Sequence, residues 1–584
     1  MPGSHRPRPS LVSPPGPRDR ARIGRFLLVA LASLACLIAV PATAMAAKEK
    51  GSDATKDRQL AEKTLEEAKD LFRGKGVKTG RELTLVLDEL SLRVRALSGK
   101  DRAQAEGILA RPTDGSADPY GDGYDPTAPL FYACSANFCF WYVATGDDAP
   151  DLSDGPDPGG VPDYVDFMAD QFEFAYEREN NQLGWLPPLP DNGIGAPDAG
   201  NANKLDVYIK NLTPQDLYGY VAPDPGQQNR SRYSFQVMDD DYIGYASTPN
   251  ESLQATAGHE YNHVLQLRYN ALTDRWHKES VATWMEEKVF PDVNDYLSYL
   301  GGWAQNSLQP LTESGDQGKF YGSAVWNHWL DRQVGEDVPR ASFEWTASQG
   351  DIGTLAYDDS IRKRGKGDLV FQFNRFAAST AEWRASNSVY PDREQYPDVA
   401  RLNDVPLRAN DGGGAVIINH LGFGLIDVAR TNLPQIRLRA TLPSKLKGGI
   451  ALVGRTGDEL GGSAATAVKD YPRGGSKFVT LNNPGQFSRI TAVIANSDAT
   501  QRGFNEQAND WFWTKDRQRI VLEVLTPACD SAKQKYNKVS RALKKARSRF
   551  KKAKRQSSKR KYSRQVRSLK KKLSKAKKRR SRNC

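Results

Sequence analysis

Histidine and cysteine are scarce in this chain of 584 residues, and long apolar runs are almost absent. The five cysteines match no zinc-finger spacing, which excludes that class of metal-binding domain. Beyond residues 1–46, no apolar run is long enough to span a bilayer, which excludes a multispan membrane protein. There are only six histidines, yet two of them fall within five residues of each other. In so histidine-poor a chain, chance rarely produces such a pair.

The two neighbouring histidines belong to the segment His259-Glu260-Tyr261-Asn262-His263, an H-E-x-x-H pattern. On a helix, positions four apart lie on one face, so both imidazoles can bind one metal ion. Glu260 lies next to the first ligand, near enough to take a proton from a water held by that ion. Zn²⁺ suits this spacing because it takes tetrahedral ligands and leaves one position open for catalysis. The alternative is an ordinary amphipathic helix with two polar positions.

A second helical pattern, Trp276 to Glu286, follows shortly after the histidines. In it Glu279 and Glu286 share a helical face with core-type residues such as Ala282 and Met285. A carboxylate on a core-facing stripe is costly unless it is paired or bound to a metal. Glu279 is therefore the expected third ligand.

The pattern Trp276-x-x-Glu279-x-x-Ala282-x-Trp284-x-Glu286 resembles the second zinc motif of gluzincins. It is most similar to that of aminopeptidase-N-type enzymes and related secreted bacterial metalloproteases. The resemblance implies a zincin-like metallopeptidase domain over residues 116–402, with a small sheet and helices. It also implies Glu279 as the third zinc ligand and Glu286 as the residue that supports the ligands. Ser280 departs from the family, where glycine is usual at that position.

Two family features are missing or displaced. Aminopeptidases carry a Gly-x-Met-Glu-Asn loop that holds the free amine of the substrate, and its absence here favours an endopeptidase. They also carry a Tyr-x-x-Gly element whose tyrosine stabilises the oxyanion. If Gly322 matches that glycine, Lys319 stands in the tyrosine's place, and Tyr321 becomes the candidate stabiliser or else a core tyrosine. His277 and His328 remain alternative ligands or acids, though each can equally be a plain histidine.

Residues 1–46 predict a secretory signal peptide. Arginines 18 to 25 form a basic region, residues 26–40 are apolar, and small-x-small cleavage sites follow. Export places the chain in oxidising surroundings, where disulfides persist. Cys134 and Cys139 are close enough in sequence to close a small loop, and Cys529 and Cys584 lie at the two ends of the C-terminal tail, residues 528–584. We therefore expect a secreted protein with both pairs bonded.

Residues 47–115 read as a helical N-terminal segment. Thr79-x-x-Glu82 matches a capping box, and apolar residues then recur at helical spacing from Leu83 to Leu97. This segment is either a propeptide that covers a cleft or a structural helix pair, and its position favours neither.

Two further patterns concern ligands of the central region. The acidic loop 147–163 carries hard oxygen ligands that can hold Ca²⁺, but it lacks the regular D-x-D-x-D-G series, which favours a solvated loop. Substrate backbones bind such proteases by pairing with an edge strand just upstream of the metal helix. Tyr233–Asp239 and Tyr242–Ala246 are the candidate edge strands.

The C-terminal third changes character twice. Short apolar runs between glycine and proline turns predict a β-sandwich over residues 403–527. Residues 528–584 then carry two stretches of heptad spacing, which predict an antiparallel coiled-coil hairpin. From Asp530 to Cys584 there are 16 Lys and 10 Arg against one Asp, a net charge of +25. For an exported protein this charge suits anionic cell-wall polymers or a membrane surface, and no nucleic acid is expected; the alternative is a solvated spacer with no partner.

Together these patterns predict an α+β multidomain chain. The expected function is that of a secreted zinc-dependent endopeptidase that acts on protein or peptide and associates with the cell wall, with His259, His263 and Glu279 as ligands and Glu260 as general base. Two other functions stay open: a zinc aminopeptidase, and a non-catalytic cell-surface binding protein with a structural metal site. A structural site would be closed by four protein ligands.

Overall fold

The computed structural model describes residues 42–114, 123–155, 160–195, 198, 200–227, 229–313, 317–402, 406–499, 503–505, 510–512 and 516–584. The chain divides into two compact units, Met1–Asp53 and Ala54–Cys584. The described part of the first unit is the beginning of helix α1 (Ala42–Leu71), so the expected signal peptide falls almost wholly outside the described residues. None of the helices in the described ranges is long and apolar enough to cross a membrane. The second unit is a mixed α+β structure.

A five-stranded mixed sheet lies at the start of the second unit, with the strand order β1-β2-β3-β5-β4. The central strands β2 (Phe138–Val143), β3 (Leu205–Lys210) and β5 (Ser234–Asp239) run parallel. The edge strands β1 (Leu130–Cys134) and β4 (Gly219–Pro223) pair antiparallel with their neighbours.

The expected edge strand is wrong. Tyr233–Asp239 supplies β5, which lies inside the sheet between β3 and β4, and Tyr242–Ala246 forms turns and bends rather than a strand. All six residues of β5 are buried, as in a strand covered on both faces. The edge on this side is β4, because the chain reverses after β4 and inserts the later strand inside it.

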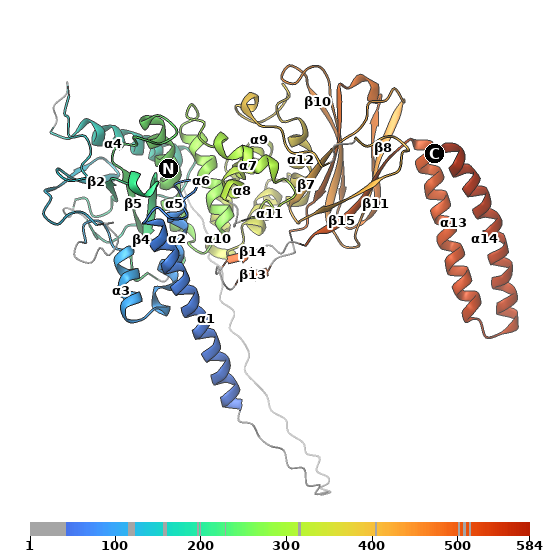
Figure 1. The fold of residues 1–584 in the computed structure, drawn as a ribbon, viewed down its shortest axis with the longest axis horizontal. Helices are drawn as coiled ribbons and strands as arrows, with labels where there is room; N and C mark the ends of the chain where they lie inside the picture. Colours follow the sequence, from blue (N-terminus) through green and yellow to red (C-terminus); the bar gives the residue numbers. More distant parts are fainter. Residues whose placement is uncertain are drawn as a thin grey trace, which may run out of the picture. The chain divides into compact units, whose positions relative to one another are not determined.

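Alternate side chains divide this sheet between two cores. Phe140, Val207 and Met238 pack on one face with helices α4 (Asp163–Tyr176) and α5 (Pro249–Tyr269). The other face, which includes Tyr208, Tyr220, Phe235 and Val237, packs with α1, α2 (Leu83–Arg93) and α3 (Gly99–Ile108). The N-terminal helices therefore form one layer of this region, and Figure 1 shows α2 beside β4.

Helix α2 does not begin with the expected capping box. Its first residue is Leu83, and Glu82 at the cap position makes no side-chain cap. The Glu82 carboxylate instead accepts hydrogen bonds from the backbone N–H groups of Lys78, Thr79 and Gly80, with distances of 2.8–3.1 Å. Glu82 therefore orders the loop before the helix rather than the first turn of it. A four-residue sequence pattern does not distinguish these two arrangements, because both place a carboxylate over free N–H groups.

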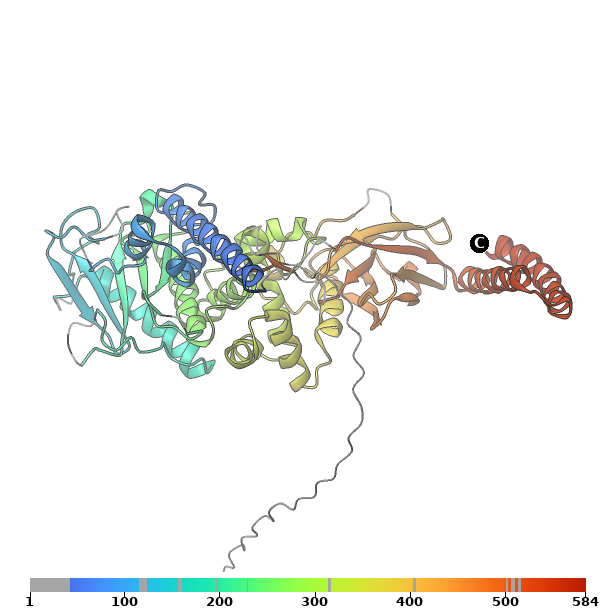
Figure 2. The same cartoon turned by 90° about the horizontal axis from the view of Figure 1, so that it is seen from below.

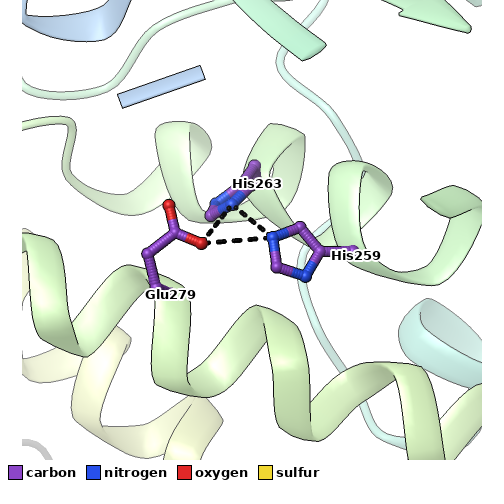
Figure 3. Close-up of side chains that lie close together, drawn as sticks. All are labelled: His259, His263 and Glu279. Atoms are coloured by element: carbon purple, nitrogen blue, oxygen red, sulfur yellow. Dashed lines mark hydrogen bonds and ion pairs between the residues drawn. The ribbon is translucent and has the colours of Figure 1, made fainter. Parts of the chain in front are cut away.

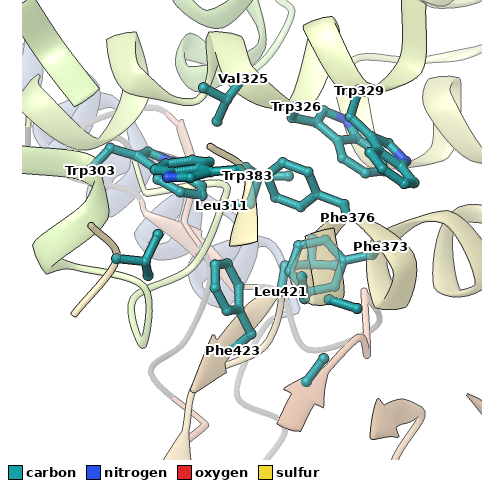
Figure 4. Packing of buried hydrophobic residues seen from close by; sticks show 14 of the residues in the cluster. Trp303, Leu311, Val325, Trp326, Trp329, Phe373, Phe376, Trp383, Leu421 and Phe423 are labelled. Carbon is teal, nitrogen blue, oxygen red and sulfur yellow. The ribbon is translucent and has the colours of Figure 1, made fainter. Parts of the chain in front are cut away.

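The helices that follow α5 pack around a core of tryptophan and phenylalanine (Figure 4). The ring centroids of Trp303 and Trp383 are 5.7 Å apart, and those of Trp326 and Phe376 are 5.3 Å apart. The core continues to Phe423 on the first sheet of the next region, which joins the helices to that sheet. These helices are α6 (Arg275–Val289), α7 (Leu297–Gln305), α8 (Gln317–Gly322), α9 (Ala324–Gln333), α10 (Val338–Gln349), α11 (Gly353–Lys363) and α12 (Leu369–Ser379).

Two four-stranded sheets follow, with the orders β10-β9-β12-β7 and β11-β8-β15-β6, and they enclose an apolar core between them. The runs expected as strands all lie in this pair of sheets. The strands are β6 (Gly414–Ile418), β7 (Gly422–Asp427), β8 (Gln435–Leu442), β9 (Gly448–Arg455), β10 (Ala464–Tyr471), β11 (Gly475–Asn482), β12 (Arg489–Asn496) and β15 (Gln518–Leu525), with the separate pair β13 (Gly503–Asn505) and β14 (Asp510–Phe512). Short helical turns are η1 (Val94–Ala96), η2 (Glu177–Gln182), η3 (Thr213–Gln215), η4 (Thr380–Glu382), η5 (Arg393–Gln395) and η6 (Pro484–Gln486).

The chain ends in two long helices, α13 (Pro527–Lys552) and α14 (Gln556–Asn583), which pack against each other, as Figures 1 and 2 both show. A disulfide joins Cys529 at the start of α13 to Cys584 just after α14. The second disulfide joins Cys134 to Cys139 across the turn between β1 and β2. Both disulfides are the pairs expected from the sequence.

Candidate metal centre

Helix α5 brings His259 and His263 to one place. It begins with a capping box in which the Thr248 hydroxyl accepts from the N–H of Glu251 and the Glu251 carboxylate accepts from the N–H of Thr248. His259 and His263 are one turn apart and almost fully buried. Because α5 packs between the sheet and α6, its polar side chains point into the protein rather than into solvent.

Glu279 on α6 completes a group of three donor atoms (Figure 3). The Nε2 atoms of His259 and His263 are 3.1 Å apart, and the Glu279 Oε2 atom lies 3.2 Å and 3.4 Å from them. Three ligand atoms at about 2.0–2.1 Å from one tetrahedral ion lie about 3.3 Å from one another. The triangle therefore has the size that a Zn²⁺ ion requires.

The charges of these three side chains suit a cation. Burial raises the pKa of Glu279, but the two imidazoles outweigh it and lower the pKa to about 2, so the carboxylate is ionised. Burial and Arg81 lower the pKa of His259, but hydrogen bonds to Glu279 and Glu286 outweigh them and raise it to about 9. A metal ion must displace that proton, so its binding is expected to strengthen as the pH rises.

A second side chain contacts the Nδ1 atom of each histidine and orients its ring. The Nδ1 atom of His259 lies 2.6 Å from the Glu286 carboxylate, and the Nδ1 atom of His263 lies 2.9 Å from the side-chain amide oxygen of Gln266. Gln266 is itself held by donating to Asn262 and to the backbone carbonyl of Lys278. Such partners fix which ring nitrogen faces the metal. Glu286 lies where the sequence predicts it, whereas Gln266 was missed, although it follows His263 by one helical turn.

Glu260 is fully buried beside the donor group. Its Oε2 atom accepts a hydrogen bond of 2.8 Å from the Thr84 hydroxyl, and its Oε1 atom has no hydrogen-bond partner among the described residues. The carboxylate thus keeps one oxygen available for a proton.

Tyr321 lies beside the same group. Its ring centroid is 5.9 Å from that of His259 and 4.9 Å from that of Tyr299. Burial and the neighbouring Glu279 raise its pKa well above the ordinary value, so the hydroxyl stays protonated and can donate. Lys319 instead lies over the Trp303 ring, 4.3 Å from its centroid.

The two alternative histidines, His277 and His328, lie outside the donor group. The Nε2 atom of His277 is 2.7 Å from the Ser342 hydroxyl, and its ring stacks on Phe343. His328 packs against Tyr296. Burial lowers the pKa of both histidines to about 3, so both are neutral core residues. Neither belongs to the donor group found in the described part of the chain.

The acidic loop 147–163 shows no such gathering of ligands in its described residues, and residues 156–159 lie outside them. Asp148 pairs with Lys210, while Asp154 and Asp163 accept backbone N–H groups within the loop. A different acidic group, Asp239 to Asp241, lies at the end of β5.

Two residues at the centre come from the N-terminal segment and were not expected from the sequence. Arg81 lies against Glu286 and His259, and Thr84 contacts Glu260. Nothing in their spacing links them to residues almost 180 positions away, so only the folded chain brings them together.

Comparison with known proteins gives no relative for this chain: no family model matches it, and neither does any curated protein.

Proposed function

We propose that the protein is a secreted zinc-dependent endopeptidase of the gluzincin type, with a zincin-like domain built on the five-stranded sheet and helices α4 to α12. One observation carries the proposal. Three buried donor atoms form a triangle of the size that Zn²⁺ requires, and a glutamate with a free oxygen lies beside it.

His259, His263 and Glu279 would hold the ion, and Glu286 and Gln266 would keep the imidazoles in the required orientation. Bound there, Zn²⁺ supplies a Lewis acid that makes water nucleophilic at neutral pH and polarises a carbonyl group. Glu260 accepts the proton of the attacking water at Oε1 and passes it to the nitrogen of the leaving amine. The protonated Tyr321 hydroxyl stabilises the negative charge that develops on the carbonyl oxygen.

The substrate backbone would pair with the outer edge of β4. This strand ends the sheet next to α5, and its Val221 N–H is not used by β5 but bonds outward to the Thr84 hydroxyl at 2.9 Å. An extended peptide along such an edge gains main-chain hydrogen bonds of this kind. The chain has no Gly-x-Met-Glu-Asn loop of the kind that holds a free amine in aminopeptidases, which favours cleavage within a chain over removal of its first residue.

The proposal is tested by metal analysis and casein hydrolysis on the wild type, Glu260→Gln and His263→Ala, with Glu62→Gln, at a partly exposed position of α1, as a matched control. Glu260→Gln is expected to keep one Zn²⁺ and lose hydrolysis at least about 1,000-fold, while His263→Ala loses the metal. The control should match the wild type. Equal hydrolysis by the wild type and Glu260→Gln would contradict the mechanism. A zinc X-ray absorption spectrum that indicates four protein ligands would instead show a structural site.

We further propose that α13 and α14 hold the protein at an anionic surface such as a cell-wall polymer. In the described part of the chain no salt bridge involves an α14 side chain, so its Lys and Arg are available to a polyanion. We expect the protein to be retained on cell-wall preparations and its retention to fall as salt rises. A chain with six tail lysines replaced by glutamine should not be retained. Retention independent of salt would contradict it.

A further inference from the structure

The segment Gly80–Thr84 lies along the outer edge of β4, in the position proposed for a substrate. The Gly80 carbonyl oxygen accepts a hydrogen bond of 3.0 Å from the N–H of Tyr218, the residue just before β4. Four residues later, the Thr84 hydroxyl accepts from the Val221 N–H at 2.9 Å and donates to Glu260 at 2.8 Å. The segment therefore uses the outward N–H groups of the edge strand and the proposed general base at the same time.

Glycine at position 80 allows this close approach. Its φ angle is +79°, in the region that disfavours side chains, and an added Cβ atom would lie 2.5 Å from the Tyr218 ring and 2.8 Å from the Asp216 carbonyl oxygen. Any other residue at this position would push the segment away from the edge strand.

Arg81 extends from this segment into a buried pocket. The guanidinium pairs with the carboxylate of Glu286 and, at 3.1 Å, with that of Asp295, and it lies over the Tyr218 ring at 5.5 Å from the centroid. The Arg81 side chain is only 1% exposed, and the Glu286 side chain 3%. Two carboxylates and an aromatic face form a site selective for a cation, because a neutral side chain would leave both charges unpaired.

Charge pairs then hold α2 against the helix that carries Glu279. The Asp88 carboxylate lies 2.5 Å from the Lys278 ammonium, and Glu89 pairs with Arg275. Both partners belong to α6. The segment is thus fastened at its edge-strand end and at its helical end.

We propose that Gly80–Thr84 is an intramolecular pseudosubstrate: it keeps the metal centre latent, and the Arg81 pocket is a substrate subsite for the basic side chain of a peptide. This inference rests on the proposed endopeptidase function. The metal centre becomes active when these residues leave the edge of β4, and the exposed pocket then selects Arg or Lys next to the bond that is cut.

Latency is tested in the zinc-loaded full chain with two variants that loosen the segment and leave the metal ligands and Glu260 themselves unsubstituted; Thr84→Val also removes the hydrogen bond to Glu260. Gly80→Ala introduces the clash with Tyr218, and Thr84→Val removes the hydroxyl alone. Arg102→Ala, on the exposed side of α3, is the matched control. Gly80→Ala is expected to raise casein hydrolysis at least about tenfold. Thr84→Val is expected to raise it by a smaller factor, and the control should not change it. Wild-type hydrolysis as fast as that of both variants would overturn latency.

Hydrogen exchange supplies a readout that does not depend on activity. The amides of Tyr218 and Val221 should exchange at least about tenfold faster in Gly80→Ala than in the wild type or Arg102→Ala. Faster exchange with bound zinc and no hydrolysis in any chain would refute the endopeptidase function while showing that the segment is displaced. Unchanged exchange together with unchanged hydrolysis would refute the inference alone.

The pocket is tested with agmatine, a small guanidinium compound, on Arg81→Ala in the inactive Glu260→Gln background. Agmatine at millimolar concentration should raise the melting temperature of this chain by about 3 °C or more, and should leave Arg102→Ala in the same background unchanged. No shift would overturn the cation subsite. If Arg81→Ala does not fold, Gly80→Ala decides, because it should cleave peptides with Arg in the selected position at least about tenfold faster than matched peptides with Glu. Equal rates would overturn the preference.

Discussion

The N-terminal segment and the C-terminal tail are both helical, and they differ in what surrounds their charges. Arg81, Asp88 and Arg93 in the first are buried and paired with carboxylates or ammonium groups. In the second, almost all Lys and Arg are exposed, and only a few residues, among them Leu543 and Ala546, are buried. Charges buried in pairs fasten a helix to its own fold, whereas exposed charges of one sign leave it free to bind something else.

The base of the tail is the exception that supports this distinction. Asp530 is fully buried and pairs with Arg439 at 2.5 Å and Arg437 at 3.2 Å, both on β8. Here a charged residue is used as in the N-terminal segment, and a second pair, Lys533 with Glu523 on β15, also attaches the base of the tail to the β region. Four experiments test the comparison, from the largest expected effect to the smallest.

Cys584→Ser should cost the tail about 4 kcal/mol, because the disulfide closes a loop with a sequence separation of 55. With a net charge of +25 in residues 530–584, the helices should then unfold at low salt and refold as salt is added. Circular dichroism melts at two salt concentrations measure this. The Cys134–Cys139 pair, with a separation of 5, is the control and should cost about 2 kcal/mol without salt dependence. Tail helicity independent of both salt and the disulfide would remove the contrast.

Leu87→Ala in α2 should lower the free energy of unfolding of the main transition by about 3 kcal/mol, because Leu87 is fully buried in the core shared with the sheet. Leu543→Ala in α13 should lower only the stability of the tail. Denaturant melts followed by tryptophan fluorescence separate the two, since no tryptophan lies in residues 527–584. If Leu87→Ala leaves the main transition unchanged, the N-terminal segment is not part of that fold.

Asp88→Asn should cost about 2 kcal/mol, because the buried Lys278 ammonium loses its charged partner and keeps only its hydrogen bond to the Ala271 carbonyl oxygen. Lys544→Gln, at an exposed position of the tail, should change stability by less than about 0.5 kcal/mol, and in the stabilising direction at low salt. Thermal melts of both variants provide the comparison. Equal changes in stability would mean that burial does not determine how much these charges contribute to the free energy of unfolding.

Asp530→Asn should weaken the docking of the tail by about 1 kcal/mol at neutral pH. Burial raises the pKa of Asp530, but the hydrogen bonds and charges of Arg439 and Arg437 outweigh it and lower the pKa below the ordinary value. The stabilisation is therefore present above the unfolded pKa of about 4 and is lost as the pH falls through the folded value. Hydrogen exchange at the base of α13, followed as the pH falls from 7 through the acid range, checks this, and a difference between the two chains that does not shrink with falling pH would contradict it.

Local spacing predicted what depends on local geometry. His259, Glu260 and His263 are placed by the period of one helix, and Glu279 and Glu286 by that of a second, so five positions of the site follow from two short patterns. The disulfides follow from cysteine positions, and the strands of the C-terminal sheets from alternation with turn residues.

What could not be predicted depends on contacts between distant parts of the chain. The order of β5 and β4 in the sheet is set by how the chain reverses, which strand patterns do not encode. Arg81 reaches Glu286 across 205 positions, and a buried arginine has no sequence signature of its own. The Thr79–Glu82 pattern misled because a carboxylate can serve a loop as well as a helix end.

The covalent closure of the tail bears on how the protein responds to proteolysis. The outer turn between α13 and α14 contains Lys554 and Arg555, which a trypsin-like enzyme would cut first. A single cut there leaves α13 on the main chain, and the Cys529–Cys584 bond still holds the α14 fragment to it. The cut tail would therefore keep its charge, and the α14 fragment would separate only on a reducing gel.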